Sequence, residues 1–323
     1  MAVTAKAVSE LRKATGAGMM DCKKALTESG GDIDGALDYL RKKGQKVAAK
    51  RADREANEGI VVAICEGGQA ALLSLSCETD FVAKNEDFIA LANSVAKVAS
   101  DGNVATAAEV AGLEMDGKPI SECLVDYTGK IGEKIEVSDF QVIQGDNIAS
   151  YIHAGSKIGV LVSYKDGGNS ESPQFFRSIA MHIAAMSPSI LTPDEFDAEL
   201  VDKETEALQN QIKIENEDRE RLGKTLKTVP QYVSKKQLTP EVLAKAEEEI
   251  KAQLAAEGKP EKIWDKIVPG KMERFVADNT LLDQDRCLLS QFFALDDSKT
   301  VEKAVADFAD GAEIVAFKRV SVG

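Results

Sequence analysis

One order of strands, turn and helix occurs twice along this 323-residue chain, and this repetition constrains the fold more than any other feature. In residues 59–98, two apolar or alternating runs flank a Gly-Gly turn, and a short connector leads to a helix pattern with four aligned apolar side chains. Residues 148–186 show the same order around a turn at Gly155. We therefore predict an internal duplication that gives two α+β subdomains.

Residues 4–44 show a different pattern, with three short helices separated by glycines. In the third helix Asp32 can act as the N-cap, apolar residues follow at helical spacing, and a basic run precedes Gly44. We predict a three-helix bundle that ends at Gly44. Residues 45–58 are rich in alanine and charge and lack glycine, so they predict a helical linker.

Residues 194–278 are rich in Glu, Lys, Leu and Ala and show no strand pattern, which predicts a projecting helical hairpin of coiled-coil type. A helix pattern over 298–309 and a strand pattern over 313–322 can complete the second α+β subdomain, with the hairpin as an insertion. The predicted domains are the helical domain with its linker (1–54), the first core subdomain (55–146), the second core subdomain (147–190 and 280–323) and the inserted hairpin (191–279).

The charge of the chain opposes direct binding to nucleic acid. The formal net charge is −14 at pH 7, whereas affinity for nucleic acid depends on neutralising phosphates with basic side chains. Residues 1–54 are basic, with 12 Lys and Arg against 7 Asp and Glu, whereas the remainder of the chain is acidic as a whole, so the first domain differs from the rest.

The cysteines and the hydropathy favour a soluble cytosolic protein. The five cysteines are scattered and form no C-x-x-C motif, so we predict reduced side chains and neither disulfides nor structural zinc. The chain opens without a signal-peptide pattern, and no apolar run approaches the roughly 18 residues that span a bilayer. Secretion and membrane insertion are therefore disfavoured.

Motifs for bond chemistry are missing from the sequence. The segment Gly223-Lys224-Thr225 resembles the end of a phosphate-binding loop, but Asp218 stands where that motif has its first glycine. With only His153 and His182, a zinc-protease motif is impossible and a histidine-based catalytic triad has few candidates. We predict a protein that is not an enzyme and has no metal site and no cofactor.

Two long motifs resemble the elongation factor Ts family: LRKATGAGMMDCKKALTESGGDIDGALDYLRKKG (11–44) and ETDFVAKN (78–85). Shorter matching motifs follow in the family's order: KIGE (130–133), YIHAGSKIGVLV (151–162), MHIAA (181–185), GKPEKI (258–263), GKMERF (270–275) and DSKTV (297–301). The resemblance implies a ubiquitin-associated-like helical domain, a core of two similar α+β subdomains and a protruding coiled-coil hairpin.

The resemblance also implies a function, guanine-nucleotide exchange on the GTPase elongation factor Tu during translation. In the family the loop that corresponds to Thr79–Val82 reaches toward the magnesium site of the partner, which would make Asp80 and Phe81 the intruding pair. From the sequence alone, Phe81 is expected to be a core residue that anchors the connector, and only the resemblance favours a partner contact.

Further partner contacts are implied by the resemblance, and each also has a simpler interpretation. These residues are Met19, Met20, Lys23, Ile131, Gly132, His153, Ala294 and Leu295. The simpler interpretations are bundle core for the two methionines, a solvated helix residue for Lys23, the start of a strand for the Ile-Gly pair, and a partly buried, hydrogen-bonded side chain for His153. Ala294 and Leu295 differ from the residues of the family at that place.

Two other functions compete with exchange. Residues 1–54 can be a ubiquitin-associated-like adaptor with the rest as scaffold, or the α+β core can hold an acid/base pair. The sequence leaves open whether the protein forms a homodimer or a 2:2 complex with its partner.

Overall fold

The computed structural model describes residues 3–323, which divide into two compact units. The first unit extends to Ala184 and includes Glu313–Gly323, and the second is Ala185–Ala312. Helices and strands occur in both, in agreement with the predicted α+β class. None of the helices within the described residues is long and apolar enough to cross a membrane.

Three helices open the first unit: α1 (Ala5–Thr15), α2 (Met19–Glu28) and α3 (Ile33–Arg51). Asp32 caps α3 as predicted, because its carboxylate accepts a hydrogen bond of 2.8 Å from the N–H of Gly35. The three helices pack around a small core that contains Leu11, Cys22 and Leu26. The glycine at position 16, with φ of 66°, ends α1 in the left-handed conformation.

The prediction that the third helix ends at Gly44 is wrong, since α3 continues to Arg51. Gly44 is buried where α3 crosses α7 (Ile120–Ile131) at Gly129. A Cβ atom on Gly129 would lie only 2.4 Å from the Cα of Gly44. The glycine therefore allows two backbones to approach rather than terminating a helix.

The first sheet of this unit has three antiparallel strands in the order β1-β2-β5, covered on its outer face by helices. The elements are β1 (Glu58–Glu66), β2 (Gln69–Cys77), α4 (Asp80–Ala83), α5 (Glu86–Asp101), α6 (Ala107–Gly112), β3 (Glu114–Met115), β4 (Lys118–Pro119), α7 and β5 (Glu136–Gln144). The predicted apolar face of α5 is confirmed at Phe88, Leu91 and Val95, which are buried in the core between helices and sheet.

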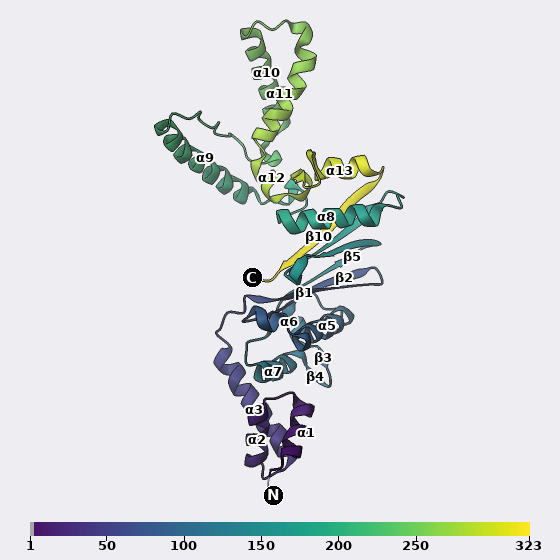
Figure 1. Ribbon diagram of the computed structural model, residues 1–323. Helices are drawn as coiled ribbons and strands as arrows, with labels where there is room; N and C mark the ends of the chain where they lie inside the picture. The colour runs from purple at the N-terminus through teal and green to yellow at the C-terminus, as the bar shows by residue number, and fades with distance from the viewer. Residues whose placement is uncertain (1–2) are drawn as a thin grey trace. The chain divides into compact units, whose positions relative to one another are not determined.

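A second three-stranded sheet, in the order β10-β7-β6, packs on the inner face of the first. Its elements are β6 (Asn147–Ile152), η1 (Ala154–Ser156), β7 (Ile158–Asp166), α8 (Ser172–Met186) and β10 (Ala312–Ser321). Val61, Leu72, Leu161 and Val320 are buried between the two sheets. Figure 1 shows α5, α6 and α7 on one side of the paired sheets and α8 on the other.

Helix α8 covers the outer face of the second sheet. Phe176 of α8 stacks on Tyr164 of β7 with the ring centroids 3.9 Å apart, and Ile179 and Ile183 are also buried. Met186 is 48% exposed because it lies at the last position of the helix.

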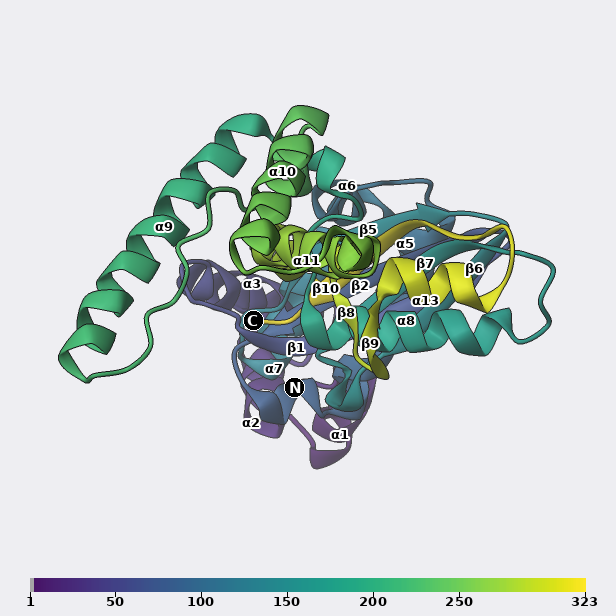
Figure 2. The same cartoon turned by 90° about the horizontal axis from the view of Figure 1, so that it is seen from above.

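The second unit is mostly helical. Its elements are η2 (Pro193–Glu195), α9 (Ala198–Arg221), η3 (Lys235–Gln237), α10 (Pro240–Ala256), η4 (Glu261–Ile263), α11 (Trp264–Asp278), α12 (Leu281–Arg286), η5 (Leu288–Ser290), β8 (Phe292–Phe293), β9 (Asp296–Thr300) and α13 (Val301–Phe308). Helices α10 and α11 lie side by side (Figure 2) and bury Ile250, Leu254 and Val268 between them.

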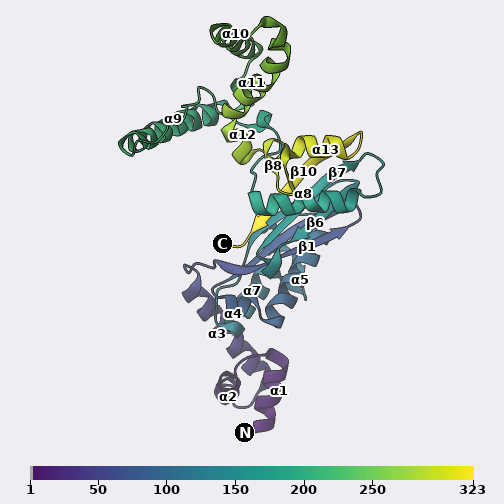
Figure 3. The same ribbon diagram turned by 45° about the horizontal axis from the view of Figure 1, so that its top comes forward.

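Helix α9 points away from the α10–α11 pair, as Figure 3 shows. An irregular segment returns along α9 instead: the side chain of Asn216 bonds the backbone of Lys227, and Gln209 bonds the carbonyl of Pro230. The helical hairpin of this unit is therefore formed by α10 and α11.

Candidate functional site

The turn after β2 carries a highly exposed aromatic side chain, Phe81. Phe81 is 82% exposed, so its interpretation as a core residue is wrong. Its neighbours Val82 and Ala83 pack into the core of the first sheet and its helices. Because they anchor the single-turn helix α4 from one side, Phe81 is directed to solvent on the other.

Asp80 also faces solvent, where its carboxylate accepts a hydrogen bond of 2.7 Å from the ammonium group of Lys84. This contact within one helical turn lowers the pKa of Asp80 and raises that of Lys84. Asp80 is therefore an exposed, ionised carboxylate beside the exposed ring.

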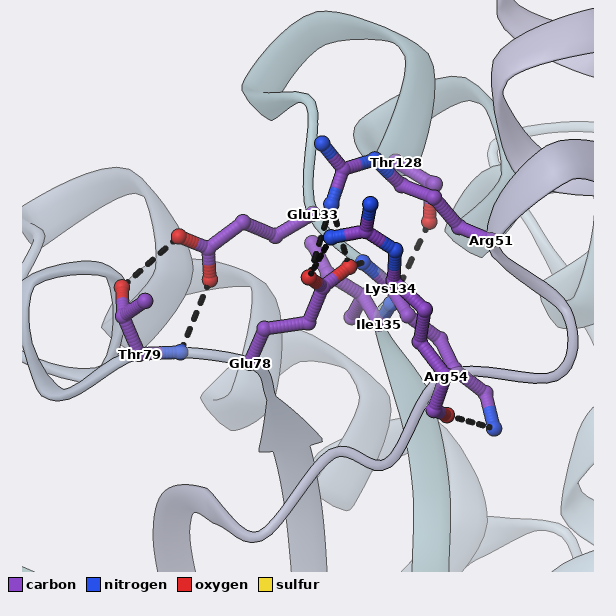
Figure 4. Close-up of polar contacts among 8 residues, drawn as sticks. All are labelled: Arg51, Arg54, Glu78, Thr79, Thr128, Glu133, Lys134 and Ile135. Carbon is purple, nitrogen blue, oxygen red and sulfur yellow. Dashed lines mark hydrogen bonds and ion pairs between the residues drawn. The ribbon is translucent and has the colours of Figure 1, made fainter.

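Thr79 begins α4 and is held by Glu133 from the turn between α7 and β5. The N–H of Thr79 donates to Oε2 of Glu133 at 2.9 Å, and its hydroxyl donates to Oε1 at 2.7 Å (Figure 4). The hydroxyl oxygen also accepts from the N–H of Val82 at 3.5 Å, as an N-cap does. Both oxygens of Glu133 are thus used to hold one residue of the turn.

Glu78, the residue before the turn, lies among basic groups and is 13% exposed in its side chain. Nη1 of Arg51 lies 2.6 and 2.7 Å from its two oxygens, Arg54 donates at 3.0 Å and the N–H of Lys134 at 2.7 Å (Figure 4). Burial acts to raise the pKa of Glu78, but these donors outweigh it and lower the pKa from 4.5 to about 2. Glu78 is ionised at neutral pH.

Cys77, the last residue of β2, is buried and contacts the turn through its thiol. Its thiol donates to the carbonyl oxygen of Thr79 at 3.2 Å. Burial and then the negative charge of Glu133 raise the pKa of Cys77 to about 12. A thiol with that pKa is protonated at neutral pH and cannot act as a nucleophile there.

Met19 and Met20 are not part of the bundle core, which corrects their simpler interpretation. They are 59% and 72% exposed at the start of α2, whose buried face is formed by Cys22 and Leu26. Lys23 is exposed one turn after Met19. The first turn of α2 therefore presents two flexible apolar side chains and a cation to solvent.

Ile131 and Gly132 end a helix rather than begin a strand. Ile131 is the last residue of α7, and Gly132 is its C-cap with φ of 85°, a left-handed conformation that favours glycine. The N–H of Gly132 donates to the carbonyl of Thr128 at 2.8 Å. This sharp end of α7 places Glu133 beside Thr79.

His153 is exposed, not partly buried, in the turn that follows β6. Its Nδ1 lies 3.0 Å from the hydroxyl of Tyr151, so the predicted hydrogen bond is present. Ala294 and Leu295 lie in the second unit between β8 and β9, and both are exposed, Leu295 at 69%. The neighbouring Phe292, which the sequence did not single out, is 48% exposed.

The structure thus brings the 79–82 turn together with the end of α7, two places that the sequence motifs marked separately. The sequence missed the chemical role of Glu78 and Glu133, although each stands at one end of a motif, ETDFVAKN and KIGE. Among the described residues, no three His, Cys, Asp or Glu side chains gather in a way that could hold a metal ion.

Comparison with known proteins identifies close relatives. The family model described as elongation factor TS matches residues 78–228 and 227–323. The chain is 69% identical over 322 residues to elongation factor Ts of Rhodopirellula baltica, with 99% of each chain covered. It is 47% identical to elongation factor Ts of Flavobacterium johnsoniae, again with 99% of each covered, and 46% identical to that of a Sulfurovum species, with 98% and 93% covered.

Proposed function

This chain belongs to the elongation factor Ts family of translation elongation factors, and from that membership we propose that it is a guanine-nucleotide exchange factor for elongation factor Tu. It would bind the GDP form of this GTPase in the cytoplasm and speed the loss of GDP. The protein would act by binding alone, with no bond chemistry, metal or cofactor of its own.

The observation that carries the proposal is the exposed ring of Phe81 on an anchored turn. Transfer of a Phe side chain from water into an apolar pocket is favourable by roughly 1.5–3 kcal/mol. Inserted beside the partner's magnesium, the ring would displace ligands of an ion that requires near-ideal octahedral geometry. Asp80 beside it would bring a carboxylate close to the phosphates, which it repels once its ion pair with Lys84 opens.

The required free energy is modest. Each 1.36 kcal/mol removed from the barrier to GDP release gives about a tenfold faster release. By thermodynamic linkage, a factor that weakens nucleotide binding is itself bound more weakly once nucleotide returns. The incoming nucleotide would therefore release this chain from the partner.

Other parts of the chain would extend the contact and fit the family's architecture. We assign α1, α2 and the start of α3 to a ubiquitin-associated-like domain and the two sheets to a duplicated core. In support, both sheets consist of a hairpin followed by a third strand that pairs with the hairpin's second strand. The proposed contacts outside the 79–82 turn are Met19, Met20, Lys23, Ile131, Gly132, His153, Ala294 and Leu295.

The direct test is release of a fluorescent GDP analogue from elongation factor Tu of the same organism. Catalytic amounts of this protein should accelerate the release. Phe81→Ala should slow the accelerated release by roughly ten- to hundredfold, which corresponds to the loss of one buried Phe side chain. Leu226→Ala, which shortens another exposed apolar side chain (53%), should leave the rate unchanged. Absence of acceleration by the wild-type protein would reject the proposal.

The exposed methionines favour one alternative, a ubiquitin-associated-like adaptor without exchange activity. The paired substitution Met19→Ala with Met20→Ala would abolish partner binding by an adaptor, whereas Phe81→Ala would leave it intact. For an exchange factor, Phe81→Ala must affect GDP release. Point variants discriminate better than deletion of residues 1–54, because that deletion also removes Arg51 and Arg54 from Glu78.

A further inference from the structure

Two dipeptides that are far apart in the sequence exchange hydrogen bonds around the base of the 79–82 turn. The carboxylate of Glu133 accepts the N–H of Thr79 at 2.9 Å, and the carboxylate of Glu78 accepts the N–H of Lys134 at 2.7 Å. Each dipeptide thus supplies one carboxylate and one backbone donor to the other, as Figure 4 shows. We call this arrangement of residues 78–79 and 133–134 the carboxylate clamp.

The clamp leaves little freedom to the backbone that carries Phe81. Thr79 is fixed at both its N–H and its hydroxyl by Glu133, and Cys77 bonds its carbonyl oxygen. Hydrogen bonds with an ionised acceptor are roughly twice as strong as those between neutral groups. The ring begins two residues after this fixed point, on a helical turn anchored in the core by Ala83.

The clamp also connects the turn to the N-terminal helices. Arg51 is the last residue of α3, and its guanidinium group contacts both oxygens of Glu78. Arg54 adds a second cation to the same carboxylate at 3.0 Å. The end of the bundle's long helix is therefore fixed to the residue that precedes the turn.

We propose that Glu78 and Glu133 are positioning residues for nucleotide exchange, an inference that rests on the proposed function. Neither contacts the partner in this role. By keeping residues 79–82 in one conformation, they reduce the conformational entropy that is lost when Phe81 enters the nucleotide site. Binding to the partner through other surfaces does not require residues 79–82 to be ordered. The clamp should therefore affect the rate of GDP release more than the affinity for the partner.

The test is steady-state GDP exchange on elongation factor Tu with Glu133→Gln and Glu78→Gln. The amide of Gln at position 133 is uncharged and has only one acceptor oxygen, so the Thr79 N–H and hydroxyl lose the ionised carboxylate whose two oxygens each accept one of them. The expected result is a kcat for GDP release that is lower by at least about tenfold. KM for the partner should change by less than about threefold.

Glu66→Gln is the matched control in the same unit. Glu66 is ion-paired with Lys97 at 2.6 Å, yet it lies at the opposite end of β1 from the strand end nearest the turn. Its substitution removes a charge and an ion pair without touching the clamp, and kcat should remain that of the wild type. Arg51→Gln removes the contact between α3 and Glu78 and should lower kcat severalfold. This variant tests the clamp if Glu133→Gln fails to fold.

Amide hydrogen exchange of the protein without its partner gives a readout independent of activity. In Glu133→Gln, the amides of Thr79 and Val82 should exchange at least about tenfold faster than in the wild type. Amides within β1 and β2 should be unaffected, because the opening is local. A purely structural role would instead raise exchange throughout the sheet.

The outcomes separate the inference from the proposed function. If the wild-type protein accelerates GDP release but Glu133→Gln and Arg51→Gln retain its kcat, the positioning role is overturned and exchange activity stands. If the wild-type protein fails to accelerate release, the proposed function falls. Unchanged exchange at Thr79 in the folded Glu133→Gln variant overturns the clamp irrespective of activity.

Discussion

At Glu78, burial and hydrogen bonding act on one carboxyl group in opposite directions. Burial alone favours the protonated form, whereas the Lys134 N–H and the two guanidinium groups favour the ionised form, and the second effect dominates. The folded-state pKa of about 2 lies below the ordinary value of 4.5, which is taken for the unfolded chain. Glu78 must therefore make stability depend on pH.

The sign of this dependence follows from linkage. A carboxyl group with a lowered folded-state pKa contributes stability above its unfolded pKa of 4.5, and this contribution is lost as pH falls toward 2. Glu78→Gln should be less stable than the wild type at pH 7, and the difference should shrink between pH 5 and pH 3. Urea unfolding of both proteins across this range measures it. A difference that stays constant with pH would contradict the assigned pKa.

Single residues of the site were predictable to different degrees. The motif ETDFVAKN marked Phe81, but whether the ring is buried or exposed depends on which side of a single helical turn meets the core. The partnership of Thr79 with Glu133 joins residues 54 positions apart, and no local pattern carries that information. Sequence spacing indicates periodic faces well and pairings of separate loops poorly.

At the scale of elements, helix patterns were predicted better than their ends. Asp32 was identified as an N-cap because capping is local chemistry, whereas Gly44 was mistaken for a helix end. Position 44 is a glycine because the backbone of α7 approaches closely there, at Gly129. The sequence pattern did not predict the elements between α5 and β6. These include α6, α7 and β5.

The crossing of α3 and α7 can be tested by adding one methyl group. Gly129→Ala would place a Cβ 2.4 Å from the Cα of Gly44, so the helices must separate, at a cost of about 1–3 kcal/mol. Gly112→Ala, also at a helical position but with nothing within 4 Å of the new Cβ, should be neutral or slightly stabilising. Thermal unfolding compares the two. Equal stabilities would show that the helices are not in contact there.

The fold of residues 222–234 could not be predicted from composition. Helix α9 was expected to pair with another helix, but its polar side chains bond the backbone of the returning segment instead. Such contacts depend on two amide side chains, Gln209 and Asn216. Polar residues at this spacing also occur on helix faces that are simply solvated, so the pattern does not reveal the contact.

At the scale of the whole molecule, each of the two units contains apolar clusters, such as the one around Phe88 in the first unit and the one between α10 and α11 in the second. The cluster of α10 and α11 contains Leu254, which is 1% exposed. The α10–α11 cluster is therefore a local source of stability within the second unit.

Leu254→Ala tests whether this stability is local to α10 and α11. Removal of a buried leucine should cost about 2–5 kcal/mol and accelerate amide hydrogen exchange in α10 and α11. Peptides from β2 and α5 should exchange as in the wild type. Leu222→Ala, at a leucine that is 67% exposed, is the control and should change neither set. Faster exchange in β2 would show that the two units unfold together.

The position of β10 in the sequence has a consequence for synthesis at the ribosome. Strand β7 is the middle strand of its sheet, but its partner β10 follows only after the entire second unit. The first sheet can close as soon as residue 144 has emerged, whereas β7 keeps one edge unpaired while more than a hundred further residues are translated. During that interval we expect the free edge of β7 to be able to pair with a strand of another chain. A chaperone that covers this edge would prevent such pairing.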